Sequence, residues 1–210
     1  MPQQPKYKNP LWSILIPTVP DRVGLSFQSI IGSLMEMRED RDIEILGLLD
    51  NRRRSIGAKR NSLLAIAQGE YISFVDDDDR LKDNYVEACY EAIERNNGVD
   101  LITFNMARVD PLGNELLCRH GKKAGEECEL LPDGSWEGHP THLMVWRKSL
   151  ASRFYFPDSS WQEDMKWARS AICGVRTRVD MDKCLYVYNM NMESISKAEE
   201  GRRADRLGNS

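Results

Sequence analysis

The sequence lacks any apolar run long enough to cross a membrane. A spanning helix needs roughly 20 consecutive apolar residues, and no stretch of this chain approaches that length. The first ten residues are polar and proline-rich, without the apolar core of a signal peptide. The five cysteines are scattered and include no CxxC pair, which is typical of a reducing compartment rather than a disulfide framework. We therefore expect no membrane span and a cytoplasmic location.

The sequence also lacks an excess of positive charge. The formal net charge is −4 and the pI is near 5.5, which argues against adhesion of the whole surface to nucleic acid or anionic membranes. A local basic groove stays compatible with this balance. No internal repeat divides the chain, and 210 residues suit one domain better than two. We expect a single domain over residues 1–210, with flexible tails at 1–10 and 197–210.

Short apolar runs alternate with helically spaced apolar residues through the first half of the chain. Buried strands are expected where β-rich runs are bounded by turn residues, and helices where apolar residues recur every three or four positions. The expected strands are 12–17, 43–49, 71–75 and 100–106, and the expected helices are 25–37, 56–68 and 83–95. This order is typical of an α/β fold with a Rossmann-like, mostly parallel sheet flanked by helices.

Capping residues and turns mark the expected boundaries. Gly69 is expected to cap the second helix at its C-terminus, and Asp83 to cap the third at its N-terminus. In the second half, a DPLGN turn at 110–114 predicts antiparallel strands on either side. The remaining expected elements are a polar loop at 122–135, a helix at 162–172, and strands at 175–180 and 184–190. We thus predict a small antiparallel element in the C-terminal half.

Four adjacent aspartates follow the third expected strand, in the segment 71–80 (YISFVDDDDR). Adjacent carboxylates repel one another unless a cation or solvent relieves them, and strand ends in open α/β sheets are where ligands bind. Mg²⁺ and Mn²⁺ prefer carboxylate oxygens together with substrate phosphates. Since residues i and i+2 of an extended segment share a side, Asp76 and Asp78 can face one cleft. A solvated acidic turn, with Asp79 or Asp83 capping the next helix, is the other interpretation.

Five segments carry motifs that occur together in a known order. They are SILIPTVPDR at 13–22, IEILGLLDN at 43–51, SIGAKRNSLLAIAQGEYISFVDDDD at 55–79, WQEDMK at 161–166 and YVYNMNMESIS at 186–196. Together they resemble family 2 glycosyltransferases, which are inverting enzymes of the GT-A fold. The resemblance extends from about residue 12 to residue 196. It implies transfer of a sugar from a nucleotide-sugar donor, with a UDP-sugar as the expected donor.

The resemblance implies a site for the donor nucleotide. Pro17, Thr18 and Val19 would line the pocket for the base. Asp50 would accept a hydrogen bond from that base, which we expect to be uracil. Arg60 would reach the base or the diphosphate. All five residues would thus contact the nucleotide part of the donor.

The resemblance also implies a metal site. Asp78 would be the main ligand of Mn²⁺ or Mg²⁺, Asp76 would hold the ribose or assist the metal, and Asp77 would lie beside them in the donor site. Some relatives carry a histidine in the late segment that approaches the metal. Alignment on the Ser-Ile-Ser turn puts Asn191 at that position, where an amide oxygen is a weaker ligand.

The chemistry of such a transfer needs two separate acidic sites. Negative charge grows on the leaving diphosphate, where a divalent cation stabilises it, while a base takes the proton of the attacking hydroxyl. In an inverting reaction these two groups lie on opposite faces of the sugar, so one acid cannot serve both. The resemblance makes Asp164 the general base, with Glu163 beside it. Taken alone, this pair is also explained as acids at a helix N-terminus, which the helix dipole favours.

Several weaker signals stay open. The triplet 52–54 (RRR) either neutralises phosphate or forms a solvated loop, and Trp161 either stacks on a ligand or packs in the core. His139 and His142 either contact the acceptor or the donor sugar, or lie in ordinary loops. The residues considered for zinc, Cys118, His120, Cys128, His139 and His142, match no tight zinc spacing.

Two other functions compete with sugar transfer. One is a sugar-nucleotide-binding module without catalysis. The other is a nucleotidyltransferase, but the sequence has no glycine-rich triphosphate-binding loop with a lysine, which argues against this function. The acceptor of a transferase would be a glycan or a hydroxylated base in DNA, as for some viral glycosyltransferases. The expected location is accordingly the cytoplasm of a bacterial cell or of a virus-infected host cell. The oligomeric state is left open.

Overall fold

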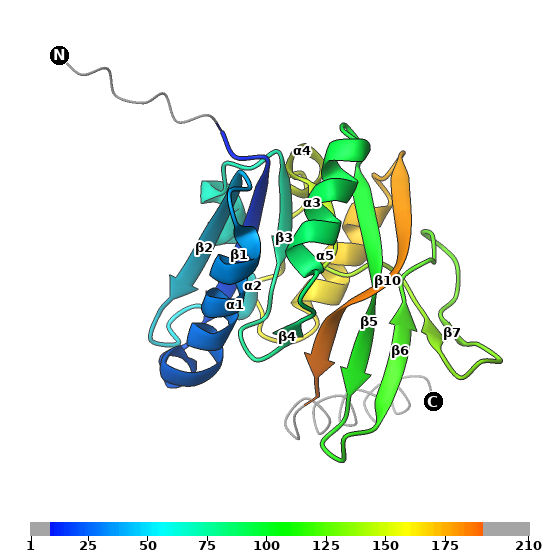
Figure 1. Ribbon diagram of the computed structural model, residues 1–210, viewed down its shortest axis with the longest axis horizontal. Coiled ribbons are helices and arrows are strands. Elements are labelled where there is room, and N and C mark those ends of the chain that lie inside the picture. Colours follow the sequence, from blue (N-terminus) through cyan, green and yellow to red (C-terminus); the bar gives the residue numbers. More distant parts are fainter. Residues whose placement is uncertain (1–8, 191–210) are drawn as a thin grey trace.

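One ten-stranded sheet organises the computed structural model, which describes residues 9–190 (Figure 1). The strands are β1 (Trp12–Thr18), β2 (Ile43–Leu49), β3 (Tyr71–Phe74), β4 (Arg80–Leu81), β5 (Leu101–Val109), β6 (Glu115–Arg119), β7 (Glu129–Leu130), β8 (Trp136–Glu137), β9 (Val145–Arg147) and β10 (Arg178–Asn189). Their order is β2-β1-β3-β9-β5-β6-β8-β7, and β10 pairs with both β5 and β4.

The long strands of this sheet run in one direction. β1 pairs in parallel with β2 and β3, and β10 pairs in parallel with β5. β3 and β5 are both antiparallel to β9, which lies between them, so β3 and β5 run the same way. Beyond β5, strand β6 is antiparallel to it, and β7 is antiparallel to β8. The expected α/β fold, with a mostly parallel sheet and a small antiparallel element, is confirmed.

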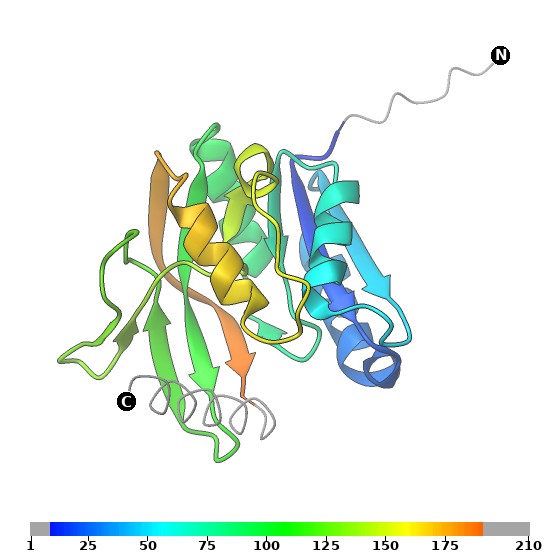
Figure 2. The same cartoon turned by 180° about the vertical axis from the view of Figure 1, so that it is seen from behind.

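Helices cover both faces of the sheet. They are α1 (Gln28–Arg38), α2 (Ile56–Ile66), α3 (Tyr85–Arg95), α4 (Lys148–Ala151) and α5 (Glu163–Ile172), with short 3-10 and π-helical turns at Pro20–Arg22 and Val23–Phe27. Helices α1 and α3 lie on the face turned to the viewer in Figure 1, and α2 and α5 lie on the opposite face, seen in Figure 2. Within residues 9–190, no helix is both long and apolar enough to span a bilayer.

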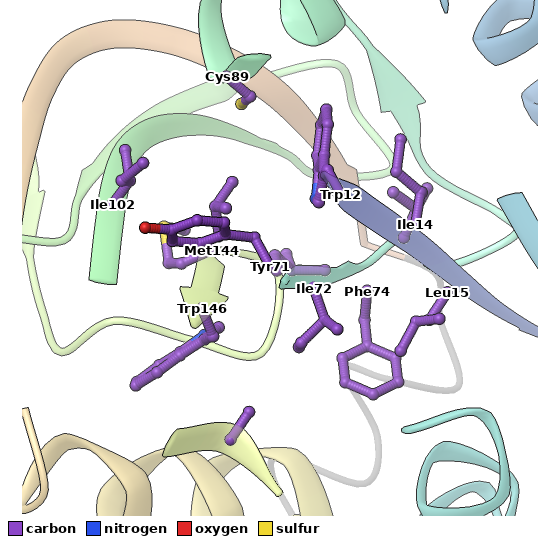
Figure 3. Close-up of a cluster of buried hydrophobic side chains, with 14 of the residues drawn as sticks. Trp12, Ile14, Leu15, Tyr71, Ile72, Phe74, Cys89, Ile102, Met144 and Trp146 are labelled. Carbon is purple, nitrogen blue, oxygen red and sulfur yellow. The ribbon is translucent and has the colours of Figure 1, made fainter. Parts of the chain in front are cut away.

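The apolar strand β1 divides the core into two layers. Trp12 and Ile14 project toward the side of Cys89 on α3, whereas Leu15 projects to the other side, as does Phe74 of β3 (Figure 3). All seven residues of β1 are buried. A strand between two parallel neighbours, with helices on both faces, is expected to read as a continuous apolar run.

Both expected helix caps are wrong. α2 ends at Ile66, and Gly69 lies instead against β1, where an added Cβ would come within 2.5 Å of the Ser13 backbone nitrogen. This glycine therefore serves close packing rather than helix termination. The N-cap of α3 is Asn84 rather than Asp83, and its side chain makes no capping hydrogen bond.

The two expected late strands are one irregular strand, β10. Its register against β5 shifts between Asp180 and Cys184 and again between Cys184 and Tyr186. The polar stretch that predicted a break is thus absorbed as an irregularity within one ladder, which bends the strand without ending it. Through this path β10 pairs with β4 at Tyr186, beside the acidic segment.

A buried histidine makes the fold sensitive to acid. His120 is 5% exposed and donates from Nδ1 to the carbonyl of His139 at 2.8 Å. Burial lowers the pKa of His120 from 6.5 to about 4. On acidification, His120 therefore binds a proton at a higher pH in the unfolded chain than in the folded one. The stability contributed by neutral His120 is fully present above pH 6.5 and is lost as the pH falls toward 4.

We expect this loss to reach about 3 kcal/mol of unfolding free energy between pH 6.5 and pH 4. Urea unfolding of wild type and His120→Asn across this range measures it. The stability difference between the two proteins should shrink by that amount on acidification. Parallel stability profiles for wild type and His120→Asn would contradict the assignment.

Candidate active site

A cleft of about 370 Å³ opens at the carboxyl ends of β1 and β3. This volume lies in the range of small-ligand sites. The cleft brings together the end of β1, the loop after β2, the start of α2, the acidic segment after β3, the loop before α5 and the end of β10. The cleft is lined by ten of the residues singled out from the sequence: Pro17, Thr18, Val19, Arg52, Arg54, Arg60, Asp76, Asp77, Asp78 and Trp161.

Asp50 and Lys59 form an ion pair at one side of the cleft. Lys59, which is 1% exposed, donates to Asp50 Oδ1 at 2.6 Å and to the Thr18 carbonyl at 2.8 Å. The backbone N–H groups of Arg52 and Arg54 also donate to the Asp50 carboxylate, each at 3.1 Å. The Lys59 hydrogen bond is the main cause of a lowered Asp50 pKa. This pair ties the loop after β2 to α2 and to the end of β1.

Two of the four aspartates are held by protein groups. Asp77 is 2% exposed and accepts from Thr18 Oγ1 at 2.5 Å and from Arg22 Nη1 at 2.6 Å. Asp79 is 4% exposed and accepts from Tyr186 Oη at 2.7 Å and from a backbone N–H of β10 at 2.8 Å. Burial raises the pKa of Asp79 well above its usual range. Both side chains therefore have a structural role, because they join the acidic segment to the β1 end and to β10.

The other two aspartates are turned toward the cleft. Asp76 receives Arg60 Nη2 at 2.7 Å and lies 3.3 Å from His142 Nε2. Burial opposes its ionisation, but the charges and hydrogen bonds of Arg60 and His142 together outweigh burial and hold the Asp76 pKa well below its usual range. Asp78 keeps 31% of its side chain exposed and pairs with Arg22 Nη2 at 2.9 Å. Burial raises the pKa of Asp78, and Arg22 offsets only part of this rise.

Arg60 joins the two acidic sites that the sequence kept apart. Its guanidinium pairs with Asp76 at the end of β3 and with Glu163 at the start of α5. It also lies over the rings of Phe74 and Phe156, at 5.9 and 5.8 Å from their centroids. Ion pairs and aromatic faces thus hold this buried side chain, although its Nε makes no hydrogen bond within the described residues.

The start of α5 separates a buried acid from an accessible one. Glu163 is 4% exposed and faces Arg60, and burial raises its pKa. Asp164 keeps 38% of its side chain exposed, and its Oδ2 lies 3.5 Å from His142 Nδ1. The accessible carboxylate of the pair is therefore Asp164.

The loop before α5 is locked against the start of α2. The Gly57 N–H donates to the Ser159 carbonyl at 3.0 Å, and Ser55 Oγ donates to Asp158 at 2.5 Å. A side chain at position 57 would collide with the Pro157 carbonyl, so only glycine allows this approach. This contact carries Trp161 to the cleft.

Residues 28–151 match the model of glycosyl transferase family 2, which is more than half of the chain. The chain belongs to this family. Its fold is of the GT-A type, as the five motifs predicted. No curated protein shows a significant match to the chain.

Crystal structures of S. aureus TarS share this fold. TarS 1–349 aligns over 85% of the glycosyltransferase chain and 60% of its own, with a TM-score of 0.57 and 17% identity. Its complex with UDP aligns over 89% and 62%, with a TM-score of 0.59 and 17% identity. Its complex with UDP-GlcNAc aligns over 86% and 58%, with a TM-score of 0.53 and 17% identity. The chain thus spans about 60% of the TarS 1–349 chain, and the likeness is one of fold.

Sequence reasoning missed several residues of the candidate site. Lys59 precedes Arg60 in the same motif, and Arg22 closes the first motif, so both lay within the recognised segments. Tyr186 and Asn189 belong to the late motif, where their pattern predicted only a strand. Asn189 donates from Nδ2 to the Asp78 carbonyl at 2.9 Å. These four residues could have been singled out because they lie within the motifs. Their contact partners could not be predicted, because the partners come from other segments of the chain.

Further predicted residues fall in different places. His142 is buried beside Arg60 and Asp76, behind the cleft lining, whereas His139 follows β8, and its Nδ1 is 3.4 Å from Cys128 Sγ. Asn191, the predicted third metal ligand, lies outside the described residues.

The described residues suit a metal ion that is shared with a substrate. Within residues 9–190, no group of three or more His, Cys, Asp and Glu side chains is arranged as a complete metal site. Mg²⁺ and Mn²⁺ in nucleotide-dependent enzymes use only one or two protein carboxylates, with substrate phosphates completing the coordination. Asp78 supplies such a carboxylate, partly exposed and beside Asp76.

Proposed function

We propose that this glycosyltransferase is an inverting enzyme that moves a sugar from a UDP-sugar to an acceptor hydroxyl with the help of Mn²⁺ or Mg²⁺. The observation that carries the proposal is the meeting of two acidic sites across Arg60. Asp76 and Asp78 come from the end of β3, Asp164 comes from α5, and Arg60 lies between them. This arrangement supplies separate groups for the leaving diphosphate and for the acceptor proton.

The donor assignment rests on the family and on the cleft. S. aureus TarS, which shares the fold, has been crystallised with UDP and with UDP-GlcNAc. In the present chain, Pro17, Thr18 and Val19 line the cleft beside Lys59, and Asp50 lies behind Lys59. These groups support a pocket for the uracil base at that side, with the diphosphate toward Asp78.

The crowding of carboxylates in the acidic segment supports a divalent cation in the donor site. Five cations line the cleft, and each lies within 4.0 Å of a carboxylate: Arg22, Arg52, Arg54, Lys59 and Arg60. Three adjacent carboxylates line it with them, and the charges of Asp76 and Asp77 add to burial in raising the pKa of Asp78. A cation at Asp78 would relieve this repulsion and would attract an incoming diphosphate.

The residues of the chain divide the reaction between them. The acceptor oxygen forms a bond to the anomeric carbon while the bond from that carbon to the diphosphate oxygen breaks. Asp164 accepts the acceptor's proton, because it is the exposed acid at the start of α5. Asp78, assisted by Asp76, would hold the metal ion. When bound, Mn²⁺ or Mg²⁺ supplies charge neutralisation on the leaving UDP.

The acceptor classes that we propose are a glycan and a hydroxylated base in DNA. Arg52 and Arg54 at the rim of the cleft support the second class, because exposed cations there can approach a phosphate backbone. Transfer assays with both acceptor classes at increasing salt separate them. A rate that falls steeply with salt only for the DNA acceptor indicates phosphate contacts.

The proposed donor and metal are tested by calorimetry and by turnover. UDP and UDP-GlcNAc should bind in the presence of MnCl₂, and removal of the metal should weaken binding by about tenfold or more. Hydrolysis or transfer of the sugar should then release UDP. Metal-dependent binding without any turnover across a broad acceptor panel would favour a non-catalytic module. Release of pyrophosphate from a nucleoside triphosphate would favour a nucleotidyltransferase.

A further inference from the structure

His142 lies between the two acidic sites of the cleft. It is 3% exposed, on the segment that leads into β9, and its ring packs 6.1 Å from that of Phe74. One ring nitrogen, Nε2, faces Asp76 and Arg60, while the other, Nδ1, faces Asp164. We propose that His142 is a positioning residue that orients the carboxylate of Asp164 through an Nδ1–H donor. This inference rests on the proposed function, in which Asp164 is the base.

The neighbours of His142 select its tautomer. Arg60 Nη2, which can only donate, lies 2.9 Å from His142 Nε2, whereas Asp76 Oδ2, which can only accept, lies farther away at 3.3 Å. The shorter contact assigns Nε2 as an acceptor. The ring proton then sits on Nδ1. There it meets Asp164 Oδ2 at 3.5 Å, an oxygen that can only accept while the acid is ionised. With the opposite tautomer, two donors would meet at Nε2 and two lone pairs would meet at Nδ1.

Asp164 depends on this contact for its direction. Among the described residues, one hydrogen bond to its side chain comes from the backbone N–H of Met165, which donates to Oδ1 at 2.7 Å. The second oxygen, Oδ2, lies 3.5 Å from His142 Nδ1, a buried atom that makes no hydrogen bond within the described residues. Hydrogen bonds of catalytic groups are often long without substrate and shorten when it binds.

Arg60 fixes His142 in turn. The guanidinium is tied to Asp76 and Glu163, so the acceptor nitrogen of His142 has a rigid partner. The path from Asp76 through Arg60 and His142 to Asp164 therefore links the metal side of the site to the base. A displaced base loses rate even when donor binding is intact, because the reaction needs a near-attack geometry.

Two substitutions test the contributions of the two ring nitrogens separately. In His142→Asn the amide nitrogen takes the place of Nδ1 and retains the donor to Asp164. In His142→Gln the amide takes the place of Nε2 and retains the contact with Arg60 but not the donor. We expect His142→Gln to lower kcat by about 10- to 100-fold with an unchanged KM for the UDP-sugar. His142→Asn should retain a higher kcat than His142→Gln, because it keeps the donor to Asp164 although it loses the contact with Arg60.

The folded state of both variants is checked by melting temperature and by the Kd for UDP with Mn²⁺. Equal kcat values for well-folded His142→Gln and wild type would overturn the inference. A loss in His142→Asn as large as that in His142→Gln would also overturn it, since it would show that the Nδ1 donor is not what matters.

A second measurement is independent of activity. The chain contains three histidines, so the ring nitrogens in long-range ¹H–¹⁵N spectra can be assigned with the His142 variants. We expect the proton of His142 on Nδ1 and an unprotonated Nε2. A proton on Nε2 with a bare Nδ1 would overturn the inference even in an active enzyme. Absence of turnover in wild type, with the expected tautomer present, would instead count against the proposed function.

Discussion

Asp164→Asn should lower kcat for sugar transfer by about 10²- to 10⁴-fold, which is the usual contribution of a general base. Asparagine keeps the size of the side chain and can still accept a hydrogen bond from His142, but it cannot take up the acceptor's proton. Of the two acids at the start of α5, Asp164 is 38% exposed, whereas Glu163 is buried against Arg60. The rate of UDP release at saturating donor and acceptor measures the effect.

Donor binding provides the internal control for this prediction. Asp164 lies outside the part of the site assigned to UDP, so the Kd for UDP with Mn²⁺ should stay at its wild-type value. A matched control is Asp40→Asn, an identical change at an exposed turn after α1, which should retain the wild-type rate. An Asp164→Asn enzyme with a wild-type kcat would require another base.

Asp78→Ala, and equally removal of divalent cations with EDTA, should lower kcat by about 10³-fold. Stabilisation of the leaving group by a bound cation is worth several kcal/mol, and about 1.4 kcal/mol corresponds to a factor of ten in rate. In Asp78→Ala, adding Mn²⁺ should no longer tighten the binding of UDP. Titration of Mn²⁺ against UDP affinity and against rate, in wild type and variant, measures both effects.

The neighbouring Asp77 provides the contrast for Asp78. Burial raises the pKa of Asp78, so its charge is costly to the free protein, and Asp78→Ala should leave the melting temperature unchanged or raise it. Asp77→Ala should lower the melting temperature, because Thr18 and Arg22 lose a buried partner. Mn²⁺-stimulated transfer that persists in Asp78→Ala would remove Asp78 from the metal site.

The parts of the fold that the sequence predicted depend on local patterns. β1, β2 and α5 match their expected ranges to within a residue or two, because apolar runs and helical spacing are properties of neighbouring residues. Gly69 and Asp83 were misread because each fits a capping rule. Gly69 is required by packing against β1, and the α3 N-terminus falls at Asn84. β10 was divided because its irregular stretch is polar, although pairing with β5 carries the strand through.

The candidate site was predicted as a set of motifs, without the relations among them. The family and its acidic motif follow from residues in sequence order, and the family match bears out this recognition. The roles of the individual site residues stay predictions. Identical aspartates cannot be told apart by local sequence, yet Asp77 and Asp79 are occupied by protein partners while Asp78 is partly exposed.

By itself, the sequence determined the α/β architecture and the membership of glycosyl transferase family 2, because both are written in short motifs and in the periodicity of apolar residues. Only the tertiary structure decided which acids share the cleft and how they are connected. Arg60 reaches Glu163 across 103 positions of the chain, and His142 reaches Asp76 across 66. Such contacts arise from the order of strands in the sheet, and the charge, burial and hydrogen-bonding state of each side chain follow from them.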